Sequence, residues 1–460
     1  MNFLKISSIP AEVVNVVLAV FFCYLVVIKK NIVEILFLSF AYCSLHFISA
    51  VFPLFDDESE IALTKLHVEG GGLLAKLSAS VFIFSVFLRL CMQAYSVWQQ
   101  RQSECLEMVV AFLLAMGFLF AGYIFNIHPD DDLQLKNIIS MEVMLVLLLV
   151  GYLGAFEYKE TKSTEWNVWV LGVFFILLLM DGIAIFEVAT QRAWARTLQS
   201  SGELVIRASA ALFNPNLFAF WGSLVCLGCV YAIYRNMNFR KFALLGVVLT
   251  AASIYFSGSR SAIYILLGVL FFISWMVEPK CWLPMILFIS TIAIIYIGSK
   301  WIFPMIFLEE DDWSRVYLLG DRFLAAPMHL IDYSMKRFFG IELNYVPSEI
   351  ELSIGGRFDG VGRDAGWLVL YHDAGWIGVL SLFLIVSKLF RRGWGNIRWH
   401  TLDDAYTLGI LLYFILTGFV MRFQIFPVWF FIGISLILCM LILRRNVTYE
   451  KINCNAYINS

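Results

Sequence analysis

Runs of about 20 apolar residues recur along this chain, and short polar stretches separate each run from the next. A helix of that length crosses the hydrocarbon core of a bilayer, because it satisfies all of its backbone hydrogen bonds internally. The chain is 61% hydrophobic and 15% charged, against about 25% charged in a soluble domain, and the deficit extends over the whole sequence. The sequence therefore predicts an all-α fold, a polytopic transmembrane helix bundle.

The apolar runs predict thirteen spans, within a range of twelve to fourteen. They cover residues 10–28, 32–54, 71–97, 107–126, 138–156, 166–186, 212–234, 241–257, 261–277, 281–304, 365–387, 403–421 and 424–443. The chain then divides into a transmembrane bundle at 1–304, a loop with short helices at 305–364, and a second bundle with a short tail at 365–460. A loop of about 60 residues is long for a connector, and such loops are commonly functional.

Lysine and arginine in short loops predict which side of the membrane each loop faces. When the spans alternate, the basic groups that fall on the cytoplasmic side are Lys29-Lys30, Arg235, Arg240-Lys241, the run from Lys388 to Arg398, and Arg444-Arg445. The loop 305–364 and the N-terminus then lie outside, and the C-terminus lies inside. Lys29-Lys30 follows the first apolar run where a signal peptide would have a small-residue cleavage site, so no cleavable signal is expected.

The cysteine and acidic clusters favour neither a metal nor a nucleic acid as ligand. Cys226 and Cys229 form a CxxC pair inside a predicted span, without a second pair, which we interpret as packing. The acidic runs 130–132 and 309–312 are typical of solvated loop ends. No basic tract suggests nucleic acid. Three charges inside apolar runs are candidates to line a water-filled cavity: Arg89, Glu142 and Asp181.

Four arginines are predicted on the exterior side, against the usual bias of positive charge toward the cytoplasm. They are Arg207 before a span, Arg260 in the turn SGSRSA, Arg322 in the long loop and Arg422 in a short turn. The planar guanidinium binds phosphate through two parallel hydrogen bonds, so these residues are candidates to hold an anionic substrate. The alternative is that each extends along a span end toward water or pairs with a carboxylate.

Asn214-Pro215-Asn216 lies at the start of a predicted span, a few residues after Arg207. Asparagine and proline are common where a helix begins, so capping is the structural interpretation of this motif. Asn214 and Asn216 are also candidates for substrate binding because of their proximity to Arg207.

Asp364 lies where the long loop re-enters the membrane, in the sequence GRDAGWLVLYHDAGWIG. A carboxylate at that depth is a candidate general base. The alternatives are an N-cap for the following helix and an ion pair with Arg363. His372 and Asp373 lie about two turns further along, where ionisable groups are either functional or polar packing contacts. The GWIG sequence that follows lets helices approach closely.

These motifs, in this order, resemble the bacterial O-antigen polymerases (Wzy type) and their relatives, the O-antigen ligases (WaaL type). The resemblance covers roughly residues 205–385. Its pieces are Arg207 with FNPNLFAFW, SGSRSA between two spans, Arg322 in a long loop that ends in FFG at 338–340, and the re-entry sequence at Asp364. Ligases typically carry a His-Asn pair at the re-entry, where this chain has Asp364, and this difference favours a polymerase.

The resemblance implies a glycan donor joined through diphosphate to undecaprenol, an acceptor that is one lipid-linked repeat unit, and a separate protein that regulates chain length. It also implies the bacterial inner membrane, with the active site facing the periplasm. The acceptor hydroxyl attacks the anomeric carbon of the donor, and the lipid diphosphate leaves. Fixed positive charge would stabilise this leaving group without a metal or other cofactor.

The candidate residues take two roles under this mechanism. The predicted catalytic set consists of Asp364 as the base and of Arg260 and Arg322, which would bind the diphosphate. The predicted substrate-binding set is Arg207, Asn214, Asn216, Arg363, Arg422 and His372. Trp313, Tyr317 and Tyr345 are candidate platforms for sugar stacking.

Two other functions remain open on the sequence alone. A flippase or transporter for the same lipid-linked sugars would also use arginines in a cavity, although transporters usually contain structural repeats, and no paired halves are evident here. An O-antigen ligase, which transfers the glycan to the lipid A core, would use the same donor. A scaffold protein would not need arginines inside the exterior part of the membrane.

Overall fold

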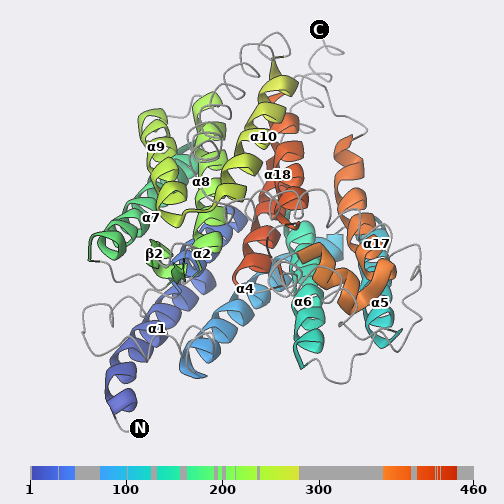
Figure 1. The fold of residues 1–460 in the computed structure, drawn as a ribbon. Helices are drawn as coiled ribbons and strands as arrows, with labels where there is room; N and C mark the ends of the chain where they lie inside the picture. The colour runs from blue at the N-terminus through green and yellow to red at the C-terminus, as the bar shows by residue number, and fades with distance from the viewer. Residues whose placement is uncertain are drawn as a thin grey trace, which may run out of the picture. The chain divides into compact units, whose positions relative to one another are not determined.

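The computed structural model describes most of the predicted helical segments. The described residues are 3–29, 31–46, 73–100, 102–125, 132–155, 163–190, 195–198, 204–212, 214–235, 239–278, 366–394, 401–419, 421, 423–424 and 426–442. They form α-helices and one short β-hairpin (Figure 1). The predicted span 281–304 and the predicted loop 305–364 lie outside the described residues.

Each of the remaining twelve predicted spans is overlapped by a described helix. The helices are α1 (Phe3–Ile28), α2 (Ile32–Leu45), α4 (Leu73–Gln100), α5 (Gln102–Phe125), α6 (Asp132–Gly154), α7 (Ser163–Thr190), α8 (Pro215–Tyr234), α9 (Arg240–Ser257), α10 (Arg260–Val277), α17 (Gly366–Trp394), α18 (Leu402–Thr417) and the helix Val428–Ile442. Among the described residues, the six helices α4 to α9 are long and apolar enough to cross a membrane. They indicate a multi-pass membrane protein, whereas the count of thirteen spans and their orientation stay predictions.

Two compact units make up the chain. The first consists of Met1–Gln100 with Val150–Leu266, and the second of Arg101–Leu149 with Leu267–Ser460. In the first unit α1 packs against α4 and α2, and α7, α8 and α9 pack against one another (Figure 1). Helix α8 is central here, since Trp221 is fully buried and its indole Nε1 donates to Ser44 Oγ of α2 at 2.8 Å.

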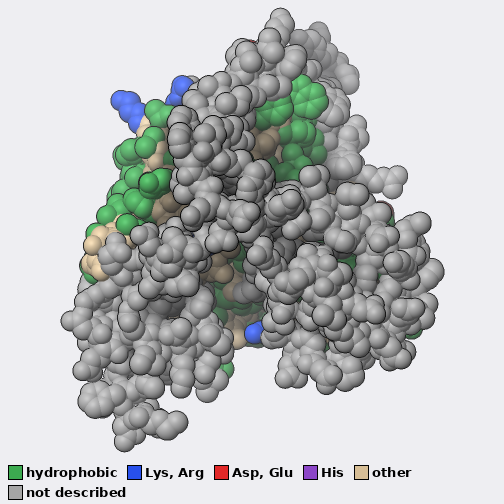
Figure 2. Space-filling model, viewed as in Figure 1, with side chains coloured by type: hydrophobic (Ala, Val, Ile, Leu, Met, Phe, Trp, Pro, Cys, Tyr) green, Lys and Arg blue, Asp and Glu red, His purple; other side chains and the backbone are tan. Residues whose placement is uncertain are grey.

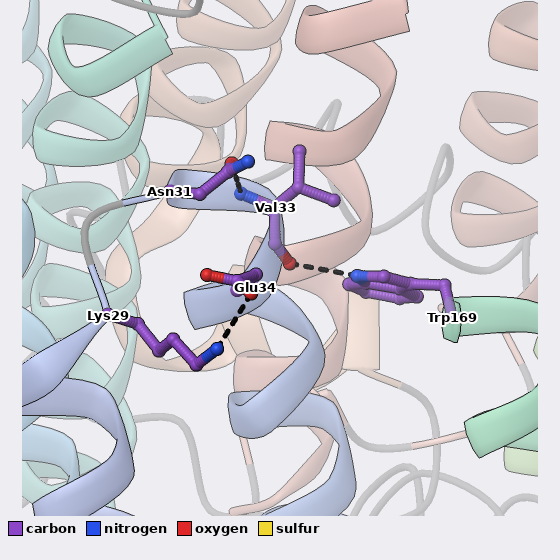
Figure 3. Close-up of polar contacts among 5 residues, drawn as sticks. All are labelled: Lys29, Asn31, Val33, Glu34 and Trp169. Carbon is purple, nitrogen blue, oxygen red and sulfur yellow. Dashed lines mark hydrogen bonds and ion pairs between the residues drawn. The ribbon is translucent and has the colours of Figure 1, made fainter. Parts of the chain in front are cut away.

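The start of α2 shows how local sequence places a helix (Figure 3). Asn31 is the N-cap, and its side chain accepts a hydrogen bond from Val33 N at 2.9 Å. Lys29 pairs with Glu34 at 2.8 Å across the turn that leaves α1. Trp169 of α7 donates from Nε1 to Val33 O at 3.0 Å. A partly buried indole N–H is satisfied by such an acceptor, so this contact fixes α7 against the first turn of α2.

Apolar side chains cover the outer faces of several helices. On α1 the exposed residues recur every three or four positions and include Val13, Val17, Val20 and Tyr24. Hydrophobic side chains also gather over the region of α7 and α9 (Figure 2). Such continuous apolar surface is unfavourable in water and fits contact with lipid.

In the second unit α5 packs along α17. Gly375 interrupts α17 with φ 62° and ψ −169°, so the single predicted span 365–387 is a helix with a kink. Only glycine adopts this backbone conformation readily. A Cβ at Gly122 of α5 would collide with the backbone carbonyl of Ala374, so glycines at the contact permit the close approach expected of the GWIG segment.

The hairpin was not part of the all-α prediction. Strand β1 (Ala195–Leu198) pairs antiparallel with β2 (Leu204–Arg207), and Ala195 lies opposite Arg207. These four-residue strands fall between the predicted spans 166–186 and 212–234, where no apolar run signals a helix. The hairpin ends at Arg207, so it helps to fix the backbone from which that side chain extends.

Candidate functional site

The structure describes the predicted site residues to different extents. Arg322, Arg363, Asp364 and Arg422 lie outside the described residues, as do Trp313, Tyr317 and Tyr345. Arg260 and His372 lie in α10 and α17, but their side chains are outside the described set. The side chains of Arg207, Asn214 and Asn216 are described, and all three belong to the first unit.

Asn214 caps α8, as the structural interpretation of the motif predicted. Its side-chain oxygen accepts hydrogen bonds from Asn216 N at 2.9 Å and Leu217 N at 3.3 Å, and Pro215 follows as the first helical residue. The helix therefore begins at Pro215 and not at 212, where the predicted span began. The short 3₁₀-helix Ala210–Leu212 precedes the cap.

Arg207 connects the start of α8 to the end of α9. Its NH2 group donates to Asn216 Oδ1 at 2.9 Å, and its Nε donates to the backbone carbonyl of Ser257 at 2.8 Å. The guanidinium is partly buried. These contacts bring the FNPN segment and the SGSRSA segment, about 40 residues apart in sequence, to one place.

The turn between α9 and α10 has a well-defined geometry. Gly258 is the C-cap of α9 with φ 64°, and its N–H donates to Tyr255 O at 3.1 Å. A Cβ at Gly258 would lie 3.4 Å from Arg207 Nε, an ordinary van der Waals distance, so the left-handed turn is what favours glycine here. Arg260 is the first residue of α10. The sequence had placed it in the turn itself.

Serine groups surround this turn. The buried hydroxyl of Ser257 donates to Ile254 O at 2.7 Å and accepts from Ser259 N at 3.2 Å. The hydroxyls of Ser259 and Ser261 lie 3.5 Å apart. Hydroxyls and the first N–H groups of a helix can bind an anion together with a guanidinium.

Sequence reasoning missed Glu187, which lies on α7 beside this segment. Its side chain is fully buried. Its carboxylate accepts hydrogen bonds from Ser209 N and Ala210 N, both at 2.9 Å, and from Ser209 Oγ at 3.3 Å. The sequence does show an acidic residue one position beyond the predicted span 166–186. That position does not reveal which groups donate hydrogen bonds to its carboxylate.

Two of the charges predicted inside apolar runs have described partners in the first unit. Asp181 is 2% exposed, and its Oδ1 accepts a hydrogen bond from the Ser253 hydroxyl of α9. Its other oxygen has no partner among the described residues. Arg89 donates from Nε to the backbone carbonyl of Lys29 at 2.7 Å, which is a structural contact at the end of α1.

A separate polar cluster lies in the second unit, just before the kink in α17. Asp373 is 1% exposed, and its carboxylate accepts a hydrogen bond from Asn137 Nδ2 at 2.7 Å. Gln134 donates to the backbone carbonyl of the same residue at 3.2 Å. These contacts connect α17 to α6 and match the polar packing interpretation of Asp373.

The described residues contain no group of three or more His, Cys, Asp or Glu side chains that could hold a metal ion. Cys226 and Cys229 are buried free thiols inside α8. The groups that the described site offers are cationic and hydrogen-bonding: an arginine fixed between two helix ends, with hydroxyls and backbone N–H groups beside it.

A scan against protein-family models gives no match, and neither does a search of curated proteins. The site is therefore characterised by its own geometry, in which Arg207 joins the start of α8 to the end of α9.

Proposed function

We propose that the protein is an O-antigen polymerase, a membrane glycosyltransferase that joins polyprenyl-diphosphate-linked repeat units into a polysaccharide. The observation that carries the proposal is the contact of Arg207 with both Asn216 and the Ser257 carbonyl. Two of the motif segments on which the resemblance depends thus lie together around a fixed cation.

The proposed reaction is a displacement at the anomeric carbon of the donor sugar. The acceptor hydroxyl oxygen forms the new glycosidic bond, and the bond from that carbon to the diphosphate oxygen breaks. The electron pair leaves with the lipid diphosphate, and the hydroxyl proton passes to Asp364. Because a diphosphate is a good leaving group, the main requirement is positive charge aimed at it in advance.

Arg207 supplies such preorganised charge in this proposal. A flexible arginine would lose side-chain entropy and reorganise at each turnover, whereas this guanidinium already has fixed hydrogen bonds to α8 and α9. Arg260, at the first position of α10, adds a second charge from the adjacent turn. Arg322 is proposed to complete the set, and Asn214 holds the helix start that carries Asn216.

The remaining assignments follow the resemblance. Arg363, Arg422 and His372 are proposed to contact the substrate. The enzyme would act at the periplasmic face of the inner membrane on two undecaprenyl-diphosphate-linked glycans, together with a chain-length regulator. No metal or other cofactor enters the proposed mechanism.

The test uses single variants in cells that lack the chromosomal copy, with the length of lipopolysaccharide O-chains as readout. Arg207→Ala and Arg260→Ala are expected to leave mostly one repeat unit on each lipid A core. Removing one preorganised charge donor typically lowers a rate by about 10²–10³-fold. The matched control is Arg235→Ala at the opposite end of α8, where Nε donates to Tyr231 Oη at 3.3 Å. Normal long chains from both site variants would refute the proposed role.

The deletion strain itself separates the polymerase from the two other functions. A polymerase deletion leaves lipid A capped with a single repeat unit. Loss of all attached glycan would instead indicate a ligase or a flippase. The buried Asp181, with one carboxylate oxygen unpartnered among the described residues, is the feature that a transporter could use. Polymer formation by purified protein in proteoliposomes would exclude that alternative.

A further inference from the structure

Glu187 is a buried carboxylate to which the proposed mechanism gives no role. It lies in the last turn of α7, with 0% of its surface exposed. Burying a carboxylate is costly unless hydrogen bonds compensate for the lost water. The groups that donate hydrogen bonds to this carboxylate therefore indicate its role.

Three hydrogen bonds to Glu187 come from the segment between β2 and α8. Two consecutive N–H groups, of Ser209 and Ala210, converge on one oxygen of Glu187 at 2.9 Å each. The Ser209 hydroxyl adds a third hydrogen bond at 3.3 Å to the other oxygen. Hydrogen bonds to an ionised acceptor are stronger than neutral ones, so the carboxylate is a strong anchor for this turn.

The turn needs such an anchor because its backbone is strained. Ala210 has φ 48°, in the left-handed region that L-residues with a Cβ rarely adopt. A residue persists in this conformation only where its surroundings hold it. Without the carboxylate, the N–H groups of Ser209 and Ala210 would converge on no acceptor, and an extended backbone would be preferred.

The same segment carries Arg207. Ala208 N donates to Phe256 O at 2.9 Å, and Arg207 Nε donates to the next carbonyl of α9, that of Ser257, at 2.8 Å. Residues 207–210 are thus held by α9 on one side and, through Glu187, by α7 on the other. If the α7 contact is lost, the arginine loses one of the supports of its backbone, while the hairpin and the α9 contacts remain.

We infer that Glu187 is a positioning residue: it holds the left-handed turn at Ser209–Ala210 and thereby places the Arg207 guanidinium between α8 and α9. The inference rests on the proposed function only in assigning a catalytic effect to that placement. The placement itself is testable without any glycan.

The decisive variants are Glu187→Ala and Ala210→Gly. Glu187→Ala is expected to lower the polymerisation rate in proteoliposomes by about 10²-fold, the scale of a misplacement near 1 Å. Glycine adopts φ near 50° without a Cβ clash, so Ala210→Gly in the Glu187→Ala background is expected to restore activity about tenfold. Glu187→Gln keeps an oxygen acceptor and is expected to lose only about tenfold.

Coupling to Arg207 separates positioning from a general loss of structure. The Glu187→Ala substitution should lower the polymerisation rate when it is introduced into the wild-type protein. Introduced into the Arg207→Ala variant, it should cause no further loss, because its effect depends on the arginine. The matched control is Asp181→Ala, another buried acid on α7, whose described partner is Ser253. Ala210→Gly should not rescue that variant. The inference would be overturned if the Glu187→Ala and Arg207→Ala losses of rate were additive, or if Ala210→Gly rescued Asp181→Ala as well as it rescues Glu187→Ala.

A thermal-unfolding series in detergent tests the turn independently of catalysis. Glu187→Ala should lower the unfolding temperature, and Ala210→Gly should recover part of that loss. If Glu187→Ala is not recovered as folded protein, Glu187→Gln with and without Ala210→Gly provides the same comparison. Full activity of both Arg207→Ala and Arg260→Ala would refute the proposed function, but it would not change the result of this unfolding series. Absence of rescue in unfolding would refute the placement itself.

Discussion

The polar contacts around Arg207 connect a turn to helix ends, whereas those around Asp373 connect two helices, α6 and α17. In the first unit, side chains of Arg207 and Glu187 bond to backbone N–H and C=O groups at helix ends and in the connecting turn. In the second unit, the Asp373 carboxylate bonds to a side chain, Asn137, within the face of a helix. The first kind of contact fixes the path of a loop, whereas the second fixes how two helices pack.

This difference separates a candidate site from a packing feature. A loop held by buried side chains presents its own polar groups in one arrangement, as preorganised recognition requires. A helix–helix contact such as Asp373 with Asn137 mainly selects one alignment of α6 with α17 before the kink at Gly375. Variants around Arg207 should therefore mainly lower activity, whereas variants around Asp373 should mainly lower stability.

The largest expected effect is on activity, at Arg207. Arg207→Lys keeps the charge but cannot donate from one planar group to both Asn216 Oδ1 and the Ser257 carbonyl. We expect about 10²-fold slower polymerisation, with an unfolding temperature close to that of wild type. The measurement is the polymerisation rate in proteoliposomes beside a thermal melt. A large loss of stability with matching loss of activity would make Arg207 a packing residue like Asp373.

The next effect is on stability, at Asp373. Asp373→Ala leaves the Asn137 amide buried without its acceptor and is expected to cost about 1–3 kcal/mol of unfolding free energy. Asp373→Asn retains an oxygen acceptor and should cost less. Equilibrium unfolding in mixed micelles measures both variants, and residual folded protein should polymerise at the normal rate per molecule. A folded but inactive Asp373→Asn variant would show that Asp373 takes part in the reaction and is not only a packing residue.

Gly258→Ala should perturb both properties to a smaller extent. A Cβ in the left-handed turn costs about 1–2 kcal/mol and would lie in van der Waals contact with Arg207 Nε, at 3.4 Å. The control is Gly228→Ala in α8, where a Cβ would have no described atom within 4 Å and should not destabilise. Equal melting curves for the two variants would show that the turn tolerates side chains and does not constrain the arginine.

The smallest effect is expected at the α8 cap. Asn214→Ala removes the acceptor for Asn216 N and Leu217 N and should cost about 1 kcal/mol. Asn214→Ser, which preserves a capping oxygen, should restore most of it. Thermal melts of the two variants and wild type provide the comparison. An activity loss in Asn214→Ser without a stability change would show that Asn214 contacts substrate beyond its capping role.

The helices were predictable because apolar runs of membrane length leave few other folds open to the backbone. The capping of α8 was predictable as well, since asparagine and proline act locally. The kink at Gly375 and the hairpin at 195–207 were not, because each depends on tertiary contacts of a segment with weak local preference. The described structure ends α2 at Leu45, and the rest of the predicted span 32–54 lies beyond His46, outside the described residues.

The candidate site was predictable in part. Arg207 and the SGSRSA turn were selected from the sequence, but their contact through the Ser257 carbonyl has no sequence signal, since every residue offers such a carbonyl. Glu187 was missed for a related reason. Its partners lie at a left-handed turn formed by Ala210, whereas such turns are usually recognised by glycine, as at Gly258.

The bond from Arg207 to a main-chain carbonyl also has a consequence for divergence and engineering. A main-chain acceptor survives replacement of its own side chain, so the bond to Arg207 does not itself require serine at position 257, whose buried hydroxyl instead serves the turn. Gly258 and the length of the turn are the constrained properties, because they determine where that carbonyl points. A redesign of this region, or a search for distant relatives of it, should therefore preserve a left-handed glycine, an upstream arginine and an acceptor at the position of Asn216.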